Sequence, residues 1–251
     1  MTISKANHKD RMVSASMILF LLFLPLSVSP QNTSGTISEQ TRYHLDPVYG
    51  VDQRLVSGPL YNRILPNSVL GNPYFIDDEW RSGSVEYKDA VFENLNLRYD
   101  TEVNRIVLMF TNVHGSKMQI ALENTAIRSM NIDGRRLVPF PGKIGTDTTL
   151  FCEEMAGGRL AYLVLRSKVL AVQNNTGSRG YYYRENVSQW LFSDSLLVPF
   201  RSKKNIFRMY PEQKQEIKQY LQSEKIYPSR WRMDDRAALV RFCNTLLTGK
   251  E

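Results

Sequence analysis

LGNPYFIDDEWRSGSVEYKDAVFENLNLRYDTEVNRIVLMF, residues 70–110, reads as a turn-rich approach followed by strands joined by short polar turns. Leu95, Leu97 and Tyr99 fall on one face of an extended chain, because successive side chains of a strand point to opposite faces. Ile106–Phe110 is apolar on both faces, which is typical of a central strand. The stretch predicts consecutive β-strands, and we expect the folded body to be built outward from it.

Turn signals extend this pattern through residue 202. Asp133-Gly134 and Gly157-Gly158 are dipeptides that favour tight hairpin turns. Residues 159–172 are apolar over a length that would also suit a helix. Their richness in Val, Leu and Tyr, and the glycine turn before them, favour a strand instead.

Two further segments complete the predicted β body. Pro139 and Pro141 restrict the strand around residues 137–140 to a sheet edge, because proline cannot donate to a ladder. Residues 181–183 and 187–192 are interpreted as the two arms of a hairpin. We therefore predict a mainly β fold over residues 70–202, namely an antiparallel meander or sandwich, or a half-barrel.

The body has a segment on either side of it. Residues 31–69 form an approach segment whose spaced aromatic residues suggest that it lies along the body. Residues 203–251 form a helical C-terminal tail of two short helices. The first opens at Pro211-Glu212-Gln213, and the second covers Met233–Leu247, with apolar residues at helical spacing. Both helices need a surface to pack on, which is the body or a partner.

Residues 1–30 have the layout of a secretory signal peptide. Basic residues precede the apolar run MILFLLFL at 17–24, and small residues follow at Ser27 and Ser29. An uncleaved membrane anchor is the alternative, but the run is shorter than the roughly 20 residues that a membrane helix requires. We expect an exported chain, in the periplasm or at the cell surface, that is not an integral membrane protein after cleavage.

The net charge of +7 is carried by the ends of the 251-residue chain. Residues 1–30 hold 3 basic and 1 acidic side chains, residues 201–251 hold 12 and 6, and residues 31–200 hold 17 and 18. A nucleic-acid-binding β domain would carry positive charge on its own face. The nearly neutral centre therefore argues against nucleic-acid binding.

No catalytic or metal constellation is found in the sequence. His8, His44 and His114 have no partner at metal-ligand spacing, so no metal and no cofactor are predicted. His114 falls in a predicted hairpin turn and is interpreted as solvated, as is the acidic cluster Asp77-Asp78-Glu79. The two cysteines, Cys152 and Cys243, would pair in an oxidising compartment or stay separately buried, and we favour the second.

Aromatic residues are the one suggestive feature. Tyr181, Tyr182, Tyr183 and Trp190 are candidate ligand-binding residues, because aromatic rings can form a stacking platform for a sugar or a peptide. The alternative is ordinary packing within the sheet, since aromatic residues are enriched in strands.

Several of these residues together resemble a pattern of uncharacterised exported β-rich proteins from Bacteroidetes-type bacteria. The matching residues are Leu60-Tyr61-Asn62, Gly71-Asn72-Pro73-Tyr74-Phe75, Trp80, Gly83-Ser84-Val85-Glu86-Tyr87, Asn94, Leu97 and Tyr99-Asp100. The chain departs from the pattern at Arg63 and Asp89, where glycine is expected, and at Phe92, where tyrosine is expected. The resemblance implies export and a β-rich fold, but no activity.

The sequence leaves three functions open. The first is a non-catalytic binding or interaction protein of the bacterial envelope, whose unidentified partner is an envelope protein, a glycan or a lipid. The second is a periplasmic carrier of a lipid or another hydrophobic ligand, suggested by the apolar residues 106–110 and 160–172. The third is a secreted hydrolase, which would need His114 or a carboxylate pair in a pocket.

Overall fold

The computed structural model describes residues 52–66, 68–143, 149–175, 178–227 and 231–248, all of which fall in the unit Glu39–Glu251. The predicted signal peptide at 1–30 and the first part of the approach segment lie outside the described residues. Among the helices of the described residues, none combines the length and the apolar character needed to cross a membrane.

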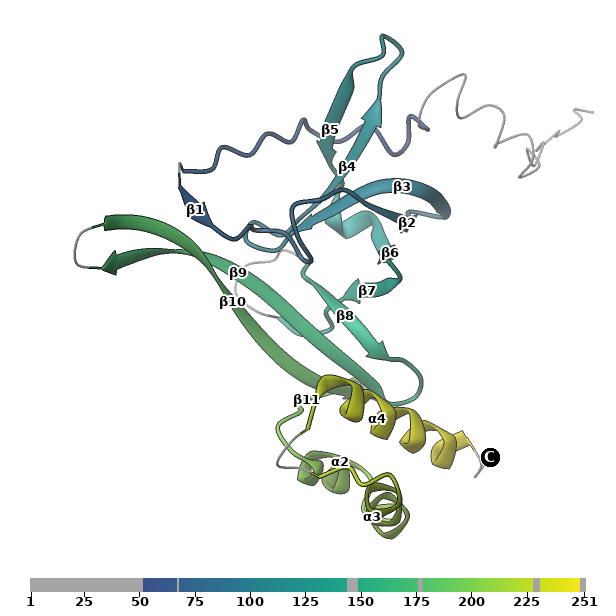
Figure 1. Ribbon diagram of the computed structural model, residues 1–251. Helices are drawn as coiled ribbons and strands as arrows, with labels where there is room; N and C mark the ends of the chain where they lie inside the picture. Colours follow the sequence, from purple (N-terminus) through teal and green to yellow (C-terminus); the bar gives the residue numbers. More distant parts are fainter. Residues whose placement is uncertain (1–51, 67, 144–148, 176–177, 228–230, 249–251) are drawn as a thin grey trace, which may run out of the picture. The chain divides into compact units, whose positions relative to one another are not determined.

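The predicted mainly β fold is confirmed, and in the described part of the chain eleven strands form a single open sheet (Figure 1). The strands are β1 (Val69–Leu70), β2 (Arg81–Tyr87), β3 (Ala90–Asp100), β4 (Arg105–Thr111), β5 (Lys117–Ala121), β6 (Ile127–Ile132), β7 (Arg135–Pro139), β8 (Phe151–Ala156), β9 (Ala161–Asn175), β10 (Ser178–Ser193) and β11 (Leu196–Pro199). Their order is β1-β10-β9-β8-β7-β6-β2-β3-β4-β5, with β11 also on β10. The sheet is mixed, because β1 pairs with β10 in parallel while the other pairs are antiparallel.

The central stretch folds as its pattern predicts. β4 contains the doubly apolar Ile106–Phe110 and lies between β3 and β5. Ile106 and Leu108 are buried in a core cluster formed mainly by β2–β7. The approach segment runs beside β5, where Tyr61 N–H donates to Gln119 O over 2.9 Å and Ala121 N–H donates to Pro59 O over 2.9 Å. Strand β5 is thereby covered on its outer side.

The edge predicted from Pro139 is wrong, because β7 lies between β6 and β8. Its ladder with β6 covers residues 135–137, whereas its ladder with β8 covers residues 137–139. Pro139 therefore lies past the end of the ladder with β6, so no hydrogen bond to β6 requires a backbone N–H at this position. Proline at the end of an interior strand satisfies the same physical condition as proline at an edge.

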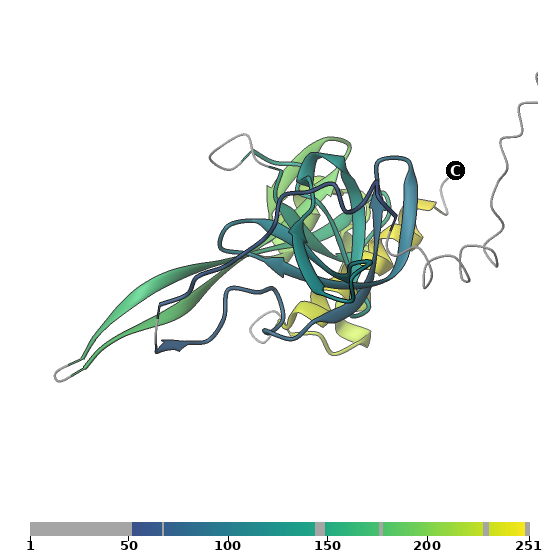
Figure 2. The same ribbon diagram turned by 90° about the horizontal axis from the view of Figure 1, so that it is seen from above.

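The hairpin predicted from residues 181–183 and 187–192 is also wrong. These residues belong to one continuous strand, β10, which pairs with β9 from Ser178↔Asn175 to Phe192↔Ala161 without a register shift (Figure 2). The polar residues 184–186 look like a turn in the sequence. They are exposed strand positions instead. The predicted strand over 159–172 is confirmed as most of β9.

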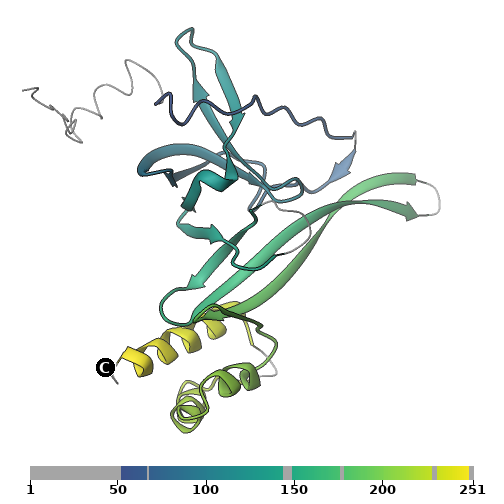
Figure 3. The same ribbon diagram turned by 180° about the vertical axis from the view of Figure 1, so that it is seen from behind.

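The described residues of the C-terminal tail form three helices rather than two: α2 (Lys203–Met209), α3 (Lys214–Ser223) and α4 (Met233–Thr248). The sequence prediction missed α2, which is short and buries only Ile206. Apolar residues of the helices pack with Leu160, Tyr162 and Val164 of the β9 region, forming a second core cluster at that end of the sheet (Figure 3). A third cluster, which contains Cys152, Leu163 and the partly buried Trp190, lies on the other face of β8–β10.

Candidate functional site

A β-bulge interrupts the β2–β3 hairpin. Gly83 lies opposite Leu95, but Val85 lies opposite Phe92, so β3 contains one residue more than β2 over this interval. Asn94 takes up the extra length with a φ of 55°, in the left-handed region that asparagine tolerates better than most residues. Bulges of this kind redirect side chains. Here the bulge leaves both Glu93 and Asn94 facing outward.

Gly83 brings the backbones of β2 and β6 unusually close. A Cβ atom at this position would lie 2.1 Å from Asn131 O, which is backbone and cannot move aside. Any other residue would push β2 and β6 apart. The bulge lies on the β3 side of β2, and this close approach lies on its β6 side. Together they leave a hollow in the outer face of the sheet.

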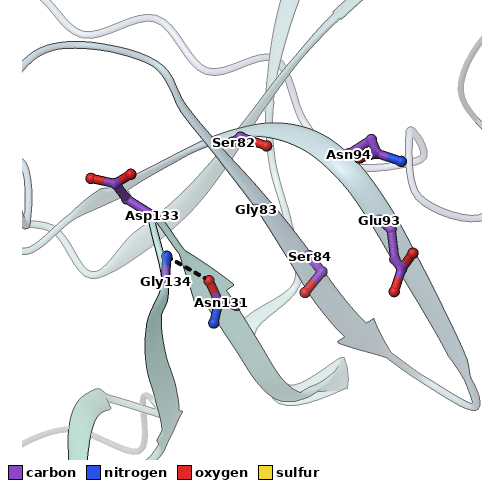
Figure 4. Close-up of a pocket in the computed structure, with 8 residues that line it drawn as sticks. All are labelled: Ser82, Gly83, Ser84, Glu93, Asn94, Asn131, Asp133 and Gly134. Atoms are coloured by element: carbon purple, nitrogen blue, oxygen red, sulfur yellow. Dashed lines mark hydrogen bonds between the residues drawn. The ribbon is translucent and has the colours of Figure 1, made fainter.

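The result is an open depression of about 360 Å³ over β2, β3 and the β6–β7 turn (Figure 4). It is lined by Ser82, Gly83, Ser84, Glu93, Asn94, Asn131, Asp133 and Gly134. The neighbouring residues Val85, Leu95 and Ile132 point to the opposite face and are buried in the core cluster of β2–β7. We refer to this hollow as the bulge depression.

The side chains of the bulge depression are polar, and several are unused by the fold. Asn131 Oδ1 accepts the Gly134 N–H over 2.9 Å, and Asp133 lies 3.8 Å from the Arg81 guanidinium. Within the described part of the chain, the side chains of Ser82, Ser84, Glu93 and Asn94 make no hydrogen bond. The lining thus offers hydroxyl, amide and carboxylate groups to a ligand. It contains no lysine, arginine or histidine.

The four aromatic candidates do not form one platform. Tyr181, which is 39% exposed, lies between Val69 and Val172, whereas Tyr182 faces the opposite side of the strand beside Ala171. Trp190 is seven residues beyond Tyr183, roughly 23 Å along an extended strand. Its ring packs edge-on against Phe140 with centroids 5.6 Å apart, and its Nε1–H donates to Ser188 Oγ over 3.0 Å.

Tyr183 takes part in a polar contact that we call the Arg63 junction, made by Tyr61, Arg63, Asp100, Glu102 and Tyr183. Tyr61 Oη–H donates to Asp100 Oδ2 over 2.5 Å, and Tyr183 Oη–H donates to Glu102 Oε2 over 2.9 Å. Arg63 forms an ion pair with Glu102, and its Nε lies 3.5 Å from Asp100 Oδ2. Burial, followed by the hydrogen bond to Asp100, raises the pKa of the Tyr61 hydroxyl well above its usual value.

The fully buried Asp100 carboxylate is satisfied by its neighbours. Its Oδ1 accepts the backbone N–H groups of Glu102 and Val103 over 2.9 and 3.1 Å. A carboxylate with this many donors is a structural group rather than a free general base. The Arg63 junction therefore fastens the approach segment to the β3–β4 turn and to β10.

The residues that follow the approach segment are also fixed by polar and aromatic contacts. Asn72 Oδ1 accepts the Tyr74 N–H over 3.0 Å and lies 3.2 Å from Lys168 Nζ. The Arg98 guanidinium lies between the rings of Trp80 and Tyr74, 4.3 and 4.8 Å from their centroids. These contacts of Asn72, Tyr74 and Trp80 serve the scaffold.

The residues considered for a hydrolase in the sequence, His114 and the acidic cluster Asp77-Asp78-Glu79, do not line the bulge depression, whose own carboxylates are Glu93 and Asp133. His114 is exposed in the β4–β5 turn, where its N–H donates to Asn112 Oδ1 over 3.0 Å. Asp77 forms an ion pair with Arg81 and accepts the Glu79 N–H. Among the described residues no three His, Cys, Asp or Glu side chains are grouped so as to hold a metal ion.

The two cysteines are free and buried in different clusters, Cys152 in the third and Cys243 in the second. This agrees with the favoured expectation of separately buried thiols. Burial raises the pKa of both thiols to about 12, so neither is a ready nucleophile at neutral pH.

Comparisons of the chain with protein-family models, with curated proteins and with solved structures gave no match. The bulge depression was not anticipated from the sequence. The Asp133-Gly134 turn was visible there, but residues 93–99 read as a regularly alternating strand, and nothing local marked the extra residue. In the structure, the depression is indicated by Asn94, which has a positive φ and a polar side chain without a hydrogen bond among the described residues.

Proposed function

We propose that this chain is an exported, non-catalytic binding protein of the bacterial envelope, and that the bulge depression receives a hydroxyl-rich ligand such as a glycan. The observation that carries the proposal is the set of unused polar side chains at Ser82, Ser84, Glu93 and Asn94 around one hollow. Carboxylates and amides accept and donate hydrogen bonds to hydroxyl groups, and a lining without cationic residues gives no preference to anions. The resemblance to exported β-rich bacterial proteins supports the location.

Binding is favoured over catalysis by the same geometry. The lining holds serines and two carboxylates but no histidine that could activate a serine, and one of the carboxylates, Asp133, already lies 3.8 Å from the Arg81 guanidinium. Catalytic turnover that is abolished by substituting a single acidic residue would contradict the proposal.

A carrier of hydrophobic ligands would need a large apolar concavity. The bulge depression is polar, and the crevice between residues 74–79 and β3, lined in part by Phe75 and Arg98, has a volume of only about 10 Å³. The apolar strand β4 that suggested a carrier is used for packing, with Ile106, Val107 and Leu108 fully buried. These contacts favour the binding protein.

The test is binding of the purified mature chain to an array of bacterial surface oligosaccharides, with affinities measured by calorimetry. Asn94→Gly keeps the positive φ while removing the amide, and Glu93→Gln removes the charge while keeping the shape. Each should weaken binding about three- to tenfold, because each loses one net hydrogen bond or its charge assistance. Glu212→Gln is the matched control, since Glu212 is exposed just before α3 and should leave affinity unchanged. Equal weakening by E212Q, or no oligosaccharide binding at all, would contradict the proposal.

A further inference from the structure

Strand β10 has two partners on its outer edge, one at each end. β1 pairs with Tyr181 and Tyr182, and β11 pairs with residues 190–193 (Figure 1). A Cβ atom added at Gly71, which follows β1, would lie 3.7 Å from Tyr183 Cβ, and Phe200 N–H donates to Gln189 O over 2.7 Å. Between these contacts, residues 184–188 have no strand partner on this edge within the described part of the chain. We call this interval the open edge.

The register shows which backbone groups the open edge presents. In an antiparallel ladder, the backbone groups of successive residues point alternately to one neighbour and to the other. Gln189 O points outward, toward Phe200, and the β9–β10 ladder has no register shift. The backbone N–H and C=O groups of Glu185 and Val187 therefore also point outward. Those of Arg184, Asn186 and Ser188 point the other way and form hydrogen bonds to β9. The open edge presents the N–H and C=O groups of Glu185 and Val187, and none of these four groups has a backbone partner among the described residues.

Side chains around the open edge are accessible. Arg184, Glu185, Asn186 and Val187 are exposed, and Val187 leaves 40% of its surface in water. Exposed strand edges of this kind are templates for pairing with another chain, unless proline, a bulge or a covering segment blocks them. No proline or bulge occurs here.

From these contacts we propose that a short extended segment of another polypeptide binds the open edge as an added strand. The length of the gap selects this partner. It admits only about five residues before an incoming strand meets β1 or β11, so the 16-residue β10 of a second copy cannot lie along it. The added strand runs antiparallel to β10, because antiparallel pairing is the more stable geometry.

Charges on the edge set the chemistry of the partner. Glu185 already forms an ion pair with Arg166 over 3.4 Å, and a basic residue opposite Glu185 on the added strand would share this carboxylate. The residue opposite Arg184 should be acidic, because directly opposed cross-strand pairs of opposite charge are stabilising. The residue opposite Val187 should be apolar. Read from its N-terminus, an antiparallel partner faces residues 187, 186, 185 and 184 in turn. Its own residues should therefore be apolar, polar, basic and acidic in that order, for example Val-Thr-Lys-Glu. This surface is separate from the bulge depression, and its test does not depend on that site.

The first measurement is amide hydrogen exchange of the full mature chain by NMR. The Glu185 and Val187 amides should exchange at least about tenfold faster than those of Arg184, Asn186 and Ser188, because only the latter are bonded to β9. Slow exchange at Glu185 and Val187 in the free chain would overturn the proposal, since another part of the chain would then occupy the edge. So would protection that grows with protein concentration, which would indicate a second copy.

The second measurement adds the capped peptide Gly-Ser-Val-Thr-Lys-Glu-Ser-Gly. It should slow exchange at Glu185 and Val187 by at least about fivefold at saturation. N-methylation of the peptide Lys removes an N–H that faces β10 and should abolish the effect. N-methylation of the peptide Thr removes an N–H that faces away from β10, and the peptide should still slow exchange. Equal behaviour of the two methylated peptides, or no effect of the parent peptide, would overturn added-strand binding.

A pair of variants completes the test. Glu185→Pro removes an outward N–H that the β9 ladder does not use, and should abolish protection of the Val187 amide by the peptide. Glu185→Gln keeps the backbone and should weaken binding only a few-fold. Circular dichroism checks that E185P keeps the fold. Asn94→Gly should bind the peptide like the natural chain, so that loss of oligosaccharide binding and loss of peptide binding are separate results.

Discussion

The two halves of the β9–β10 hairpin are held by different forces. Near its base, Leu160, Tyr162 and Val164 are fully buried against the helices, and Leu163 is buried on the opposite face. Beyond Val164, β8 no longer pairs with β9, and exposed apolar residues appear, among them Val169, Val172 and Tyr181. The same pair of strands thus passes from an apolar core into a ribbon whose only further strand, within the described part of the chain, is the two-residue β1.

Polar contacts replace apolar burial in the outer half. The Arg63 junction contacts Tyr183, and Lys168 donates to Asn72 and to the Tyr74 carbonyl. Hydrogen bonds and ion pairs contribute little net stability when water can replace them, whereas burial of apolar surface contributes in proportion to area. The comparison teaches that ladder pairing alone does not measure stability along a strand. It also explains why the open edge occurs in the outer half.

The largest expected effect comes from breaking the apolar base. Phe200 is 1% exposed and packs edge-on against Tyr162 and Trp231, with centroids 5.3 and 5.7 Å away. Phe200→Ala should lower the free energy of unfolding by about 3–5 kcal/mol, because it leaves a large cavity. Urea denaturation followed by circular dichroism measures it. A loss below about 1 kcal/mol would mean that the helices do not depend on this contact.

The Arg63 junction gives the next largest effect. Arg63→Met should cost about 2–3 kcal/mol, because it leaves Glu102 and the buried Asp100 without their cation, although Asp100 keeps its hydrogen-bond donors. Limited proteolysis should then cleave the approach segment near residues 62–72 faster. Arg184→Met is the matched control, since Arg184 is exposed on the open edge, and it should change neither quantity. Equal effects of R63M and R184M would refute the role given to the junction.

The comparison is sharpest between two valines of β9. Val164 is fully buried, whereas Val172 is 55% exposed. Val164→Ala should cost about 2 kcal/mol through lost burial and an incompletely filled cavity, whereas Val172→Ala should stay within about 0.5 kcal/mol. Denaturant midpoints of the two variants measure the difference. Similar losses at both positions would show that the ribbon is as tightly packed as the base.

The smallest effect is a pH dependence. Burial raises the folded-state pKa of the Cys243 thiol to about 12 from an ordinary value of 9.0. Above pH 9 the unfolded chain loses this proton while the folded chain keeps it, so stability falls as the pH rises from 9 toward 12. Between pH 7 and pH 10 this thiol should account for about 1 kcal/mol of lost stability.

Cys243→Ala should reduce the alkaline loss by that amount, whatever the substitution costs at pH 7. The difference between the variant and the natural chain, rather than either curve alone, isolates the thiol, because buried tyrosines also titrate in this range. An unchanged alkaline loss would mean that Cys243 is accessible to water in the folded chain.

Local chemistry was sufficient for most of the strands and turns. The alternation at Leu95, Leu97 and Tyr99, the Asp133-Gly134 turn and the apolar length of β9 each predicted the observed element, because period-two patterns and positive-φ turns are properties of a few neighbouring residues. The errors occur where the deciding partner is distant in sequence. Residues 184–186 looked like a turn because they are polar, and only their ladder with β9 keeps them extended.

By itself, the sequence determined that the protein is mainly β, that helices follow the sheet, and that the charge lies at the chain ends. Tertiary structure alone decided the strand order, the interior position of β7, the bulge depression and the open edge. These features arise from registers between segments that can be a hundred residues apart. No local pattern encodes the register of Gly83 against Ile132 or of Tyr182 against Leu70, because the free energy that fixes it comes from faces that meet only in the folded chain.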